Sequence, residues 1–371
     1  MNTLFEHVKI GDMGLSNRFV RSATGEGCAD KRGRATQELI DLYARLAEGG
    51  VGLIIAGITY VHPTGQVSQT QNSMAEDEVI EGFKRATAAA HDRGAKIAVQ
   101  LFHAGRAGRS PHSRYRLPMG PSFFEGDPYF RAPYRTMTLR EIREIVSAFG
   151  DGARRAREAG FDAVQIHGAH GYLPSQFLSP FVNRRNDQWG GSLENRIRIH
   201  QAIYEDVRRK VGKDYPVLIK IGVQDGFPGG LTFDEGRLAA KTLAQCGFDA
   251  LEISLGVRGI GYEQTEFQTK VDRLDREAYY RAWCREVKGE IDVPVMMVGG
   301  LRTFGLVQEV VQKEESDFIS LSRPLIREPG LINDWKRGDH HRAKCISCNQ
   351  CLEGLRDGEG LRCFQERKSL K

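Results

Sequence analysis

The segment from Gln165 to Tyr172, Gln-Ile-His-Gly-Ala-His-Gly-Tyr, carries the most informative chemistry in the chain. It places His167 and His170 three residues apart and a phenol, Tyr172, two residues further on. Two imidazoles can bind one substrate oxygen. Hydrogen-bond donors directed at a developing oxyanion stabilise it strongly in a pocket that excludes water. Free tyrosine, with a pKa of about 10, is a proton donor at neutral pH. We therefore expect a site that polarises one oxygen and delivers one proton. A metal site is the weaker alternative, because two histidines without a nearby third ligand bind a metal poorly.

Four of the seven cysteines crowd the C-terminal segment. Two residues separate Cys345 from Cys348 and Cys348 from Cys351, and Cys363 follows after eleven more. Because a reducing cytosol disfavours disulfides, this spacing indicates a metal or redox centre. It suits a [4Fe–4S] cluster. Four thiolates also make a closed zinc site, and a vestigial, metal-free cluster is the third alternative.

The elements that must position these groups alternate along the chain. Short apolar or β-branched runs predict eight strands, at 19–22, 51–58, 96–101, 162–167, 217–221, 250–254, 295–298 and 318–321. Amphipathic segments between them predict helices, for example at 36–48, 78–93, 139–158, 193–211 and 233–245. Eight alternating units are typical of a (β/α)8 TIM barrel, an α/β fold. We expect this barrel over residues 1–337 and a cysteine-rich tail over 338–371.

A weak internal repeat supports the barrel. Residues 159–164 read Ala-Gly-Phe-Asp-Ala-Val and residues 246–251 read Cys-Gly-Phe-Asp-Ala-Leu. In each copy the glycine suits the end of a helix, and the apolar residues after the aspartate enter a buried strand.

The connection between residues 103 and 133 is long for a compact domain. Such loops usually carry function, and in this fold they overhang the active site. Its side chains could hold an anionic or planar substrate, or form a solvated loop packed by its own rings. They are Arg106, Arg109, His112, Arg114, Tyr115, Arg116, Phe123, Phe124 and Tyr129.

Composition excludes several classes of protein. The chain of 371 residues is 40% apolar and 27% charged, as expected of a globular protein with a sizeable core. Its net charge of +5 is spread without a basic block, which argues against nucleic acid and mildly favours an anionic substrate or partner. The N-terminus lacks a signal peptide, and no apolar run approaches membrane-spanning length. We expect a cytoplasmic protein; a homo-oligomer is compatible with the sequence.

The last two predicted strands end in a pattern that suits a phosphate. Gly299 and Gly300 follow the seventh strand, and Ser322 and Arg323 follow the eighth. These two strand ends are the usual phosphate grip of the barrel. Glycines let backbone N–H groups approach an anion, and an arginine can pair with it bidentately. The sequence therefore predicts a phosphate-bearing ligand.

Two polar residues at other strand ends suit a flavin. Gln100 offers a donor and an acceptor that match the pyrimidine edge of the ring. Lys220 could stabilise the negative charge that a flavin gains near N1 on reduction. The alternatives are a satisfied polar residue for Gln100 and a structural ion pair for Lys220.

Motifs across almost the whole barrel resemble those of the old yellow enzyme family of FMN-dependent oxidoreductases. They are Ser16-Asn-Arg-Phe-Val20, Val99-Gln-Leu-Phe-His-Ala-Gly-Arg106, Ile166-His-Gly-Ala-His-Gly-Tyr-Leu173, Gln176-Phe-Leu-Ser-Pro180, the run from Arg184 to Arg196, Val298-Gly-Gly300 and Ser322-Arg-Pro324. The cysteine pattern resembles the cluster-binding segment of 2,4-dienoyl-CoA reductase and trimethylamine dehydrogenase.

The resemblance implies roles for individual residues. Gln100 would bind the isoalloxazine, Lys220 would lie near its N1 and O2 edge, and Ala23 and Thr24 would pass beside it. Gly299, Gly300 and Arg323 would hold the FMN phosphate. His167 and His170 would bind the activating carbonyl or nitro oxygen, and Tyr172 would protonate Cα while flavin N5 delivers hydride to Cβ. One position departs from the family, because members often carry Cys or Thr where this chain has Gly25, and Cys28 lies close by but out of register.

The resemblance favours an ene-reductase that reduces an activated alkene with electrons from FMN. No G-x-G-x-x-G motif follows a strand, so we expect no Rossmann domain. We therefore expect FMN to receive its electrons from NAD(P)H bound in the barrel, or from a separate ferredoxin or flavoprotein. An amine dehydrogenase that feeds the cluster is the main rival. In trimethylamine dehydrogenase a tyrosine stands where this chain has His167, which favours alkene reduction here. A non-redox aldolase or isomerase and an electron-transfer subunit are further alternatives.

Overall fold

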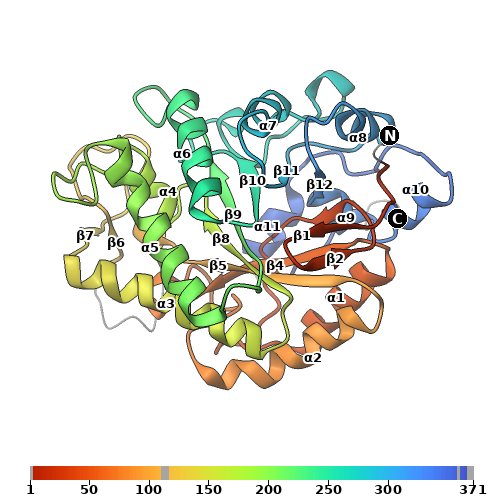
Figure 1. Ribbon diagram of the computed structural model, residues 1–371, viewed down its shortest axis with the longest axis horizontal. Coiled ribbons are helices and arrows are strands. Elements are labelled where there is room, and N and C mark those ends of the chain that lie inside the picture. Colours follow the sequence, from red (N-terminus) through yellow and green to blue (C-terminus); the bar gives the residue numbers. More distant parts are fainter. Residues whose placement is uncertain (1–2, 110–116, 357–359, 366–371) are drawn as a thin grey trace.

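The computed structural model describes residues 3–109, 117–356 and 360–365. Eight parallel strands close into a barrel, and helices surround it (Figure 1). The barrel strands are β3 (Phe19–Arg21), β4 (Leu53–Tyr60), β5 (Lys96–Phe102), β8 (Ala163–Gly168), β9 (Val217–Gly222), β10 (Ala250–Ser254), β11 (Val295–Met297) and β12 (Phe318–Leu321). Each pairs with the next, and β12 pairs with β3 to close the ring. The predicted (β/α)8 barrel is confirmed.

The helices of the outer layer connect successive strands. They are α1 (Gln37–Glu48), α2 (Ile80–His91), α3 (Leu139–Glu158), α5 (Leu193–Val211), α6 (Phe233–Cys246), α7 (Arg281–Lys288) and α8 (Phe304–Gln312). Four begin after a hydroxyl residue whose side chain accepts a first-turn backbone N–H, which satisfies a donor that the helix leaves open. These residues are Thr36, Thr138, Ser192 and Thr232.

Observed boundaries differ from the predicted ones by at most two residues. Strand β4 begins at Leu53 because the Gly52 N–H is still turned toward the carbonyl of Phe19, 3.1 Å away. The helix predicted from residue 78 starts as a 3₁₀ turn, Asp77–Val79, before α2. The prediction at 295–298 runs one residue too far, because β11 ends at Met297 before the diglycine turn.

The elements that the sequence did not predict are short. They are the hairpin of β1 (Val8–Ile10) and β2 (Met13–Leu15), the pair β6 (Met119–Gly120) and β7 (Arg135–Thr136), the helices α4 (Leu173–Leu178), α9 (Arg323–Arg327), α10 (Leu331–Lys336) and α11 (Gln350–Arg356), and 3₁₀ turns at Pro63–Gly65, Gly105–Ala107, Tyr262–Gln264 and Leu274–Arg276. Ile10, Met13 and Leu15 of the hairpin pack against the first inward side chains of the strands. This apolar plug fills the N-terminal end of the barrel, so the functional face is at the C-terminal strand ends.

The two copies of the internal repeat have the same structure. Gly160 and Gly247 adopt left-handed backbone angles, with φ of +83° and +113°. The carboxylates of Asp162 and Asp249 accept the backbone N–H of a residue in the preceding strand, at 2.9 and 2.7 Å. Each aspartate therefore sets the register between two neighbouring strands, which explains the repeat.

The tail folds back over the C-terminal face of the barrel. The buried Arg302 donates from Nε to the carbonyl of Cys345 at 2.8 Å and accepts from the Ala343 N–H at 3.0 Å. Arg323 donates from Nη1 to the side-chain oxygen of Asn349 at 2.6 Å. Among the described residues, no helix combines the length and apolarity needed to cross a membrane.

Candidate active site

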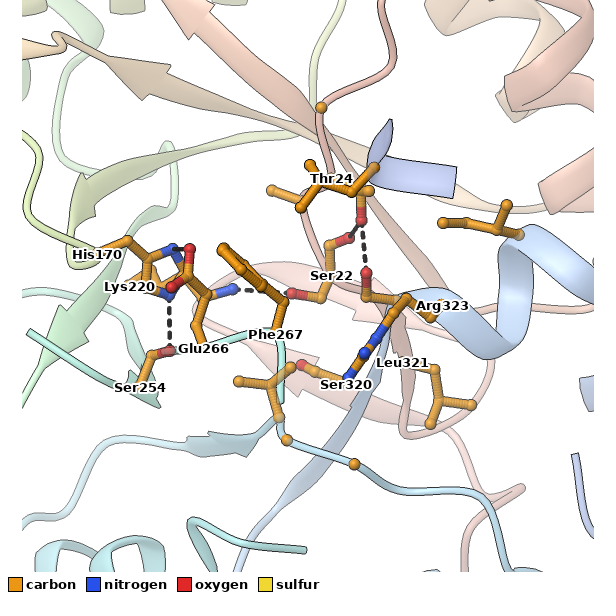
Figure 2. Close-up of a pocket in the computed structure, with 18 of the residues that line it drawn as sticks. Ser22, Thr24, His170, Lys220, Ser254, Glu266, Phe267, Ser320, Leu321 and Arg323 are labelled. Carbon is orange, nitrogen blue, oxygen red and sulfur yellow. Dashed lines mark hydrogen bonds and ion pairs between the residues drawn. The ribbon is translucent and has the colours of Figure 1, made fainter. Parts of the chain in front are cut away.

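A cleft at the C-terminal strand ends gathers every predicted catalytic and flavin-binding residue. Its empty volume, open mouth included, is about 1220 Å³. Its lining includes His167, His170, Tyr172, Ala23, Thr24, Gln100, Lys220, Gly299, Gly300, Ser322 and Arg323. Figure 2 shows Thr24, His170, Lys220 and Arg323 around one hollow, although each comes from a different strand end.

The three predicted catalytic rings lie against one another. The ring centroid of His167 is 4.9 Å from that of His170 and 5.0 Å from that of Tyr172. His170 turns back toward the barrel because its backbone is left-handed, with φ of +61°. Phe102 packs edge-on against Tyr172, with centroids 4.5 Å apart. The sequence motif therefore forms one compact wall of the cleft.

The two histidines differ in their freedom to bind a ligand. Burial lowers the pKa of both well below the usual value, and nearby Lys220 acts in the same direction. Both rings are thus neutral at pH 7, each with one N–H donor. His167 Nδ1 is buried and has no hydrogen-bond partner among the described residues. His170 is engaged, since its Nε2 lies 2.8 Å from Ser254 Oγ and its Nδ1 lies 3.5 Å from Glu266 (Figure 2). His167 can accept a ligand directly, whereas His170 must exchange a protein partner.

An arginine–glutamate pair that sequence reasoning missed completes this wall. Arg258 donates from Nη2 to the Tyr172 hydroxyl at 3.3 Å and from Nε to both carboxylate oxygens of Glu266 at 2.9 and 2.8 Å. The Arg258 guanidinium is thus placed beside the Tyr172 phenol, and Glu266 neutralises its charge. Both residues lie in the loop after β10, where only their place beyond a barrel strand end could have marked them.

A chain of hydrogen bonds beneath the cleft holds Gln100 and Lys220 in place. Gln100 Nε2 donates to Gln165 at 2.7 Å, and Gln165 donates to the buried Glu252 at 3.0 Å. Lys220 Nζ donates to Ser22 Oγ at 2.9 Å (Figure 2). It also lies 3.3 Å from Glu252. Gln100 is therefore a satisfied polar residue and Lys220 makes a structural ion pair, as the alternatives to flavin binding stated. Both residues nevertheless line the cleft. In the sequence, the only sign of Glu252 is that it is a single charged residue within an apolar strand.

Glycines and two guanidinium groups form the opposite end of the cleft. Gly299 and Gly300 have φ of +116° and +76°. A Cβ on Gly299 would lie 2.8 Å from the Tyr279 ring, so only glycine fits. Arg323 Nη1 is held by the carbonyl of Gln268 at 2.8 Å. Arg302, which the sequence did not single out, donates to the Gly300 carbonyl at 2.7 Å and also lines the cleft.

Unsatisfied polar atoms show that the cleft suits a polar ligand. Ser320 Oγ and His167 Nδ1 are buried, line the cleft and have no partner in the described ranges. Thr24 and Ser322 share a hydrogen bond of 2.8 Å between their hydroxyls, beside the guanidinium end. With amide and ammonium groups in the middle and guanidinium groups at one end, the residues fit a heterocycle that carries a phosphate, as FMN does.

The four clustered cysteines line a small cavity beside the cleft. Cys345, Cys348, Cys351 and Cys363 all contribute to it, and Cys351 lines the cleft as well. Burial and the neighbouring Cys345 raise the pKa of Cys351 to about 11. Within the described residues, no three potential ligands are arranged tightly enough to hold a metal ion. The thiols therefore share one cavity without forming a closed site.

Comparison with protein families decides the class. Residues 3–342 match the NADH:flavin oxidoreductase / NADH oxidase family. The chain belongs to this family. The predicted old yellow enzyme relationship and the flavin-dependent oxidoreductase class are confirmed.

Relatives within this family differ in the reactions that their names describe. An NADH oxidase from Thermoanaerobacter brockii is 34% identical over 365 residues, covering 97% of this chain and 54% of that protein. The structure of 2-naphthoyl-CoA reductase with 2-naphthoyl-CoA has a TM-score of 0.85 and 27% identity, covering 94% of this chain and 54% of that one. Histamine dehydrogenase from Rhizobium sp. 4-9 has a TM-score of 0.85 and 26% identity, covering 98% and 52%. The chain spans about half the length of these relatives.

The departure from the family at Gly25 has a structural counterpart in the tail. Leu352 and Leu355 of α11 line the cleft. A Cβ on Gly25 would lie 3.1 Å from Leu355 Cδ2, and one on Gly27 would lie 2.4 Å from Leu355 Cδ1. Leu355 thus occupies the space into which a larger side chain at position 25 would extend. The tail is part of the active-site wall.

Replacing Gly27 with alanine is expected to lower the thermal unfolding midpoint and loosen the tail. The substitution combines left-handed strain at φ of +64° with a displacement of the Leu355 side-chain end, for a total of about 1–3 kcal/mol. Gly94→Ala is the matched control, because φ there is +80° and nothing lies within 4 Å. Adding Leu355→Ala should recover part of the loss in the Gly27 variant. Equal shifts in the two glycine variants would contradict the contact.

The long loop contributes less to the site than its composition suggested. Arg106 is buried and paired with Asp127. The aromatic residues pack on one another or on neighbouring rings, as Tyr129 does on Phe227 with centroids 3.8 Å apart. Arg109 lines a cavity next to the cleft. His112, Arg114, Tyr115 and Arg116 lie outside the described residues.

Proposed function

We propose that the chain is an FMN-dependent ene-reductase that reduces the C=C bond of an alkene activated by a carbonyl, thioester or nitro group. The contacts of His167 with His170 and with Tyr172, in the cleft that Gln100 and Lys220 also line, carry the proposal. It places two oxygen-binding groups and one proton donor at the same wall.

Residues around the cleft would hold FMN along its length. Gln100 would bind the pyrimidine edge, and Lys220 would face the N1 and O2 edge. The phosphate would lie at Gly299, Gly300, Ser322 and Arg323, and the backbone at Ala23 and Thr24 would pass beside the ring. Bound FMN would supply the hydride. Glu252 would keep Gln100 and Lys220 oriented, because both are tied to it through buried contacts.

The residues of the other wall would bind and protonate the substrate. A neutral imidazole N–H of His167 would donate to the substrate oxygen, where charge develops. His170 would add a second donor once it releases Ser254 or Glu266. Tyr172 would give its hydroxyl proton to Cα, and Arg258 Nη2, 3.3 Å from that hydroxyl, would stabilise the phenolate left behind.

An amine dehydrogenase is the second candidate, because Glu266 brings a carboxylate to the same wall. A carboxylate could hold a cationic amine. Glu266 is, however, bound through both oxygens by Arg258. The local charge is therefore balanced, which supports alkene reduction over amine oxidation.

We also propose that Cys345, Cys348, Cys351 and Cys363 hold a [4Fe–4S] cluster. Their common cavity supports this, as does hydrogen bonding to the sulfurs: Arg327 donates to Cys363 and Gln365 to Cys348, each at 3.4 Å. Donors to sulfur are the protein's means of tuning such a cluster. All seven cysteines are free thiols, which supports a reducing compartment such as the cytoplasm.

Anaerobic purification followed by an absorbance spectrum and analysis of iron, sulfide and zinc tests both cofactors. We expect an FMN spectrum with about four iron and four sulfide per chain, by the stoichiometry of a [4Fe–4S] cluster. Zinc at one per chain, or no metal, would replace the cluster proposal. A colourless protein would contradict the flavin proposal and favour a non-redox barrel enzyme.

Single-turnover mixing separates the two redox candidates. The flavin should be reduced by NADH or NADPH, or by a ferredoxin or flavoprotein, and then reoxidised rapidly by an α,β-unsaturated ketone. Bleaching of the oxidised flavin by a methylated amine, with no reoxidation by the ketone, would instead support the amine dehydrogenase.

A further inference from the structure

A second cavity continues outward from the cleft. The two share Gly25, Ile58, Tyr172, Arg258, Phe267, Leu352 and Leu355. The outer cavity, here named the antechamber, is also lined by residues of the 67–72 loop, Ala107, Arg109 and Arg356, and its empty volume including the mouth is about 1470 Å³. The two cavities therefore adjoin along these side chains, and a ligand that reacts at Tyr172 would lie next to the antechamber.

The antechamber has an apolar side and two arginines in its otherwise polar lining. Leu352 and Leu355 of the tail and Phe267 of the loop after β10 form apolar walls. Arg109 and Arg356 are exposed and belong to segments far apart in the sequence. In the described part of the chain, neither guanidinium contacts a carboxylate. Two arginines that line the same cavity, with no acidic partner among the described residues, favour an anionic ligand.

The acidic groups beside the antechamber are already satisfied. Glu26 is buried, and its carboxylate accepts from the Tyr43 hydroxyl at 3.0 Å, from Asn72 Nδ2 at 2.8 Å and from the Gly57 N–H at 3.0 Å. Glu266, on the cleft side, is held by Arg258. Neither of these two carboxylates is free to pair with Arg109 or Arg356.

We infer that the antechamber binds the anionic end of a ligand whose reactive end lies at His167 and Tyr172, with Arg109 and Arg356 as its anchors. The ligand class is an amphipathic molecule with an activated alkene, an apolar middle and a terminal carboxylate or phosphate. The inference rests on the proposed ene-reductase function. The phosphates of NAD(P)H share the same chemistry, so the experiment must separate the two sources.

A matched pair of substrates tests the inference in the flavin-loaded protein. The pair is an α,β-unsaturated ketone with a carboxylate at the end of a short alkyl chain, and its methyl ester. Arg109→Ala and Arg356→Ala should each raise KM for the acid about tenfold. The value of kcat and the KM for the ester should stay within about twofold of wild type. A tenfold change corresponds to about 1.4 kcal/mol, the loss of one charge-assisted contact. Arg209→Ala is the control. This arginine is 69% exposed and lies near the end of α5, just before β9 begins. That end of β9 is at the face of the barrel opposite the cleft.

Each remaining outcome has a defined meaning. Equal changes for acid and ester, or no change in either arginine variant, would overturn the inference. A rise in KM for NADPH or NADH, with the acid unaffected, would overturn the alkene ligand and assign the two arginines to the nucleotide phosphates. If neither ketone is reduced, the ene-reductase proposal fails. The antechamber is then still tested by titrating the saturated acid and ester against the flavin absorbance, where only the acid should bind more weakly to the variants.

Discussion

Replacing His167 with alanine is expected to lower kcat for alkene reduction by about 10²–10³-fold, or about 2.7–4 kcal/mol, the cost of one lost oxyanion donor. The structure predicts that His167 matters more than His170. His167 Nδ1 has no partner among the described residues, whereas His170 Nε2 lies within hydrogen-bond distance of Ser254 Oγ, at 2.8 Å. Stopped-flow reoxidation of the reduced flavin by an unsaturated ketone measures the effect.

The pH profile provides a second check on this role. Because burial lowers the pKa of His167 and His170 well below the usual 6.5, both rings stay neutral as pH rises from 6 to 8. Reoxidation should therefore show no loss centred near pH 6.5. Such a loss would mean that an imidazolium is the donor. His167→Asn, which keeps an N–H donor, should recover part of the rate, and unchanged flavin content in all variants excludes a folding defect.

Replacing Tyr172 with phenylalanine is expected to slow reoxidation by the ketone about 10²–10⁴-fold, the range of general acid catalysis. The change removes only the hydroxyl that accepts from Arg258 at 3.3 Å, while the ring contact with Phe102 remains. Flavin reduction should stay intact, because no carbon is protonated in that half-reaction.

A quinone acceptor is the control for the tyrosine variant. Quinone reduction places electrons and protons on oxygen, so it does not require a proton donor aimed at carbon. Wild type and Tyr172→Phe should reduce it at similar rates. Unchanged reoxidation by the ketone would remove Tyr172 from the proton-donor role, and loss of both activities would show that the variant disturbs flavin binding instead.

Most of the barrel could be predicted from local pattern. Each strand is a short apolar run buried on both faces, and each helix has one apolar stripe, so both types are visible within single windows of sequence. The strand at 250–254 and the helices at 139–158 and 193–211 have the predicted boundaries. The β1–β2 hairpin was missed because three-residue strands give too little alternation to detect, although Ile10, Met13 and Leu15 plug the barrel.

The predicted site residues converge because they follow strands of one parallel barrel. Once the eight strands are recognised, His167, Lys220, Gly299 and Arg323 must share the C-terminal face. Their partners could not be found in this way. Arg258 and Glu266 belong to an irregular loop, and Glu252 acts through contacts with residues more than thirty positions away in the sequence.

The sequence alone determined the fold, the family and the motif side chains that meet in the cleft, because strand pattern and motif spacing are local properties of the chain. Only the tertiary structure decided how those side chains are held. It showed that His170 contacts Ser254 while His167 Nδ1 has no partner in the described ranges, that Arg258 reaches Tyr172, and that Leu355 from the cysteine-bearing tail occupies the space beside Gly25. These contacts join segments distant in sequence, and their geometry depends on the packing of loops that have no periodic pattern.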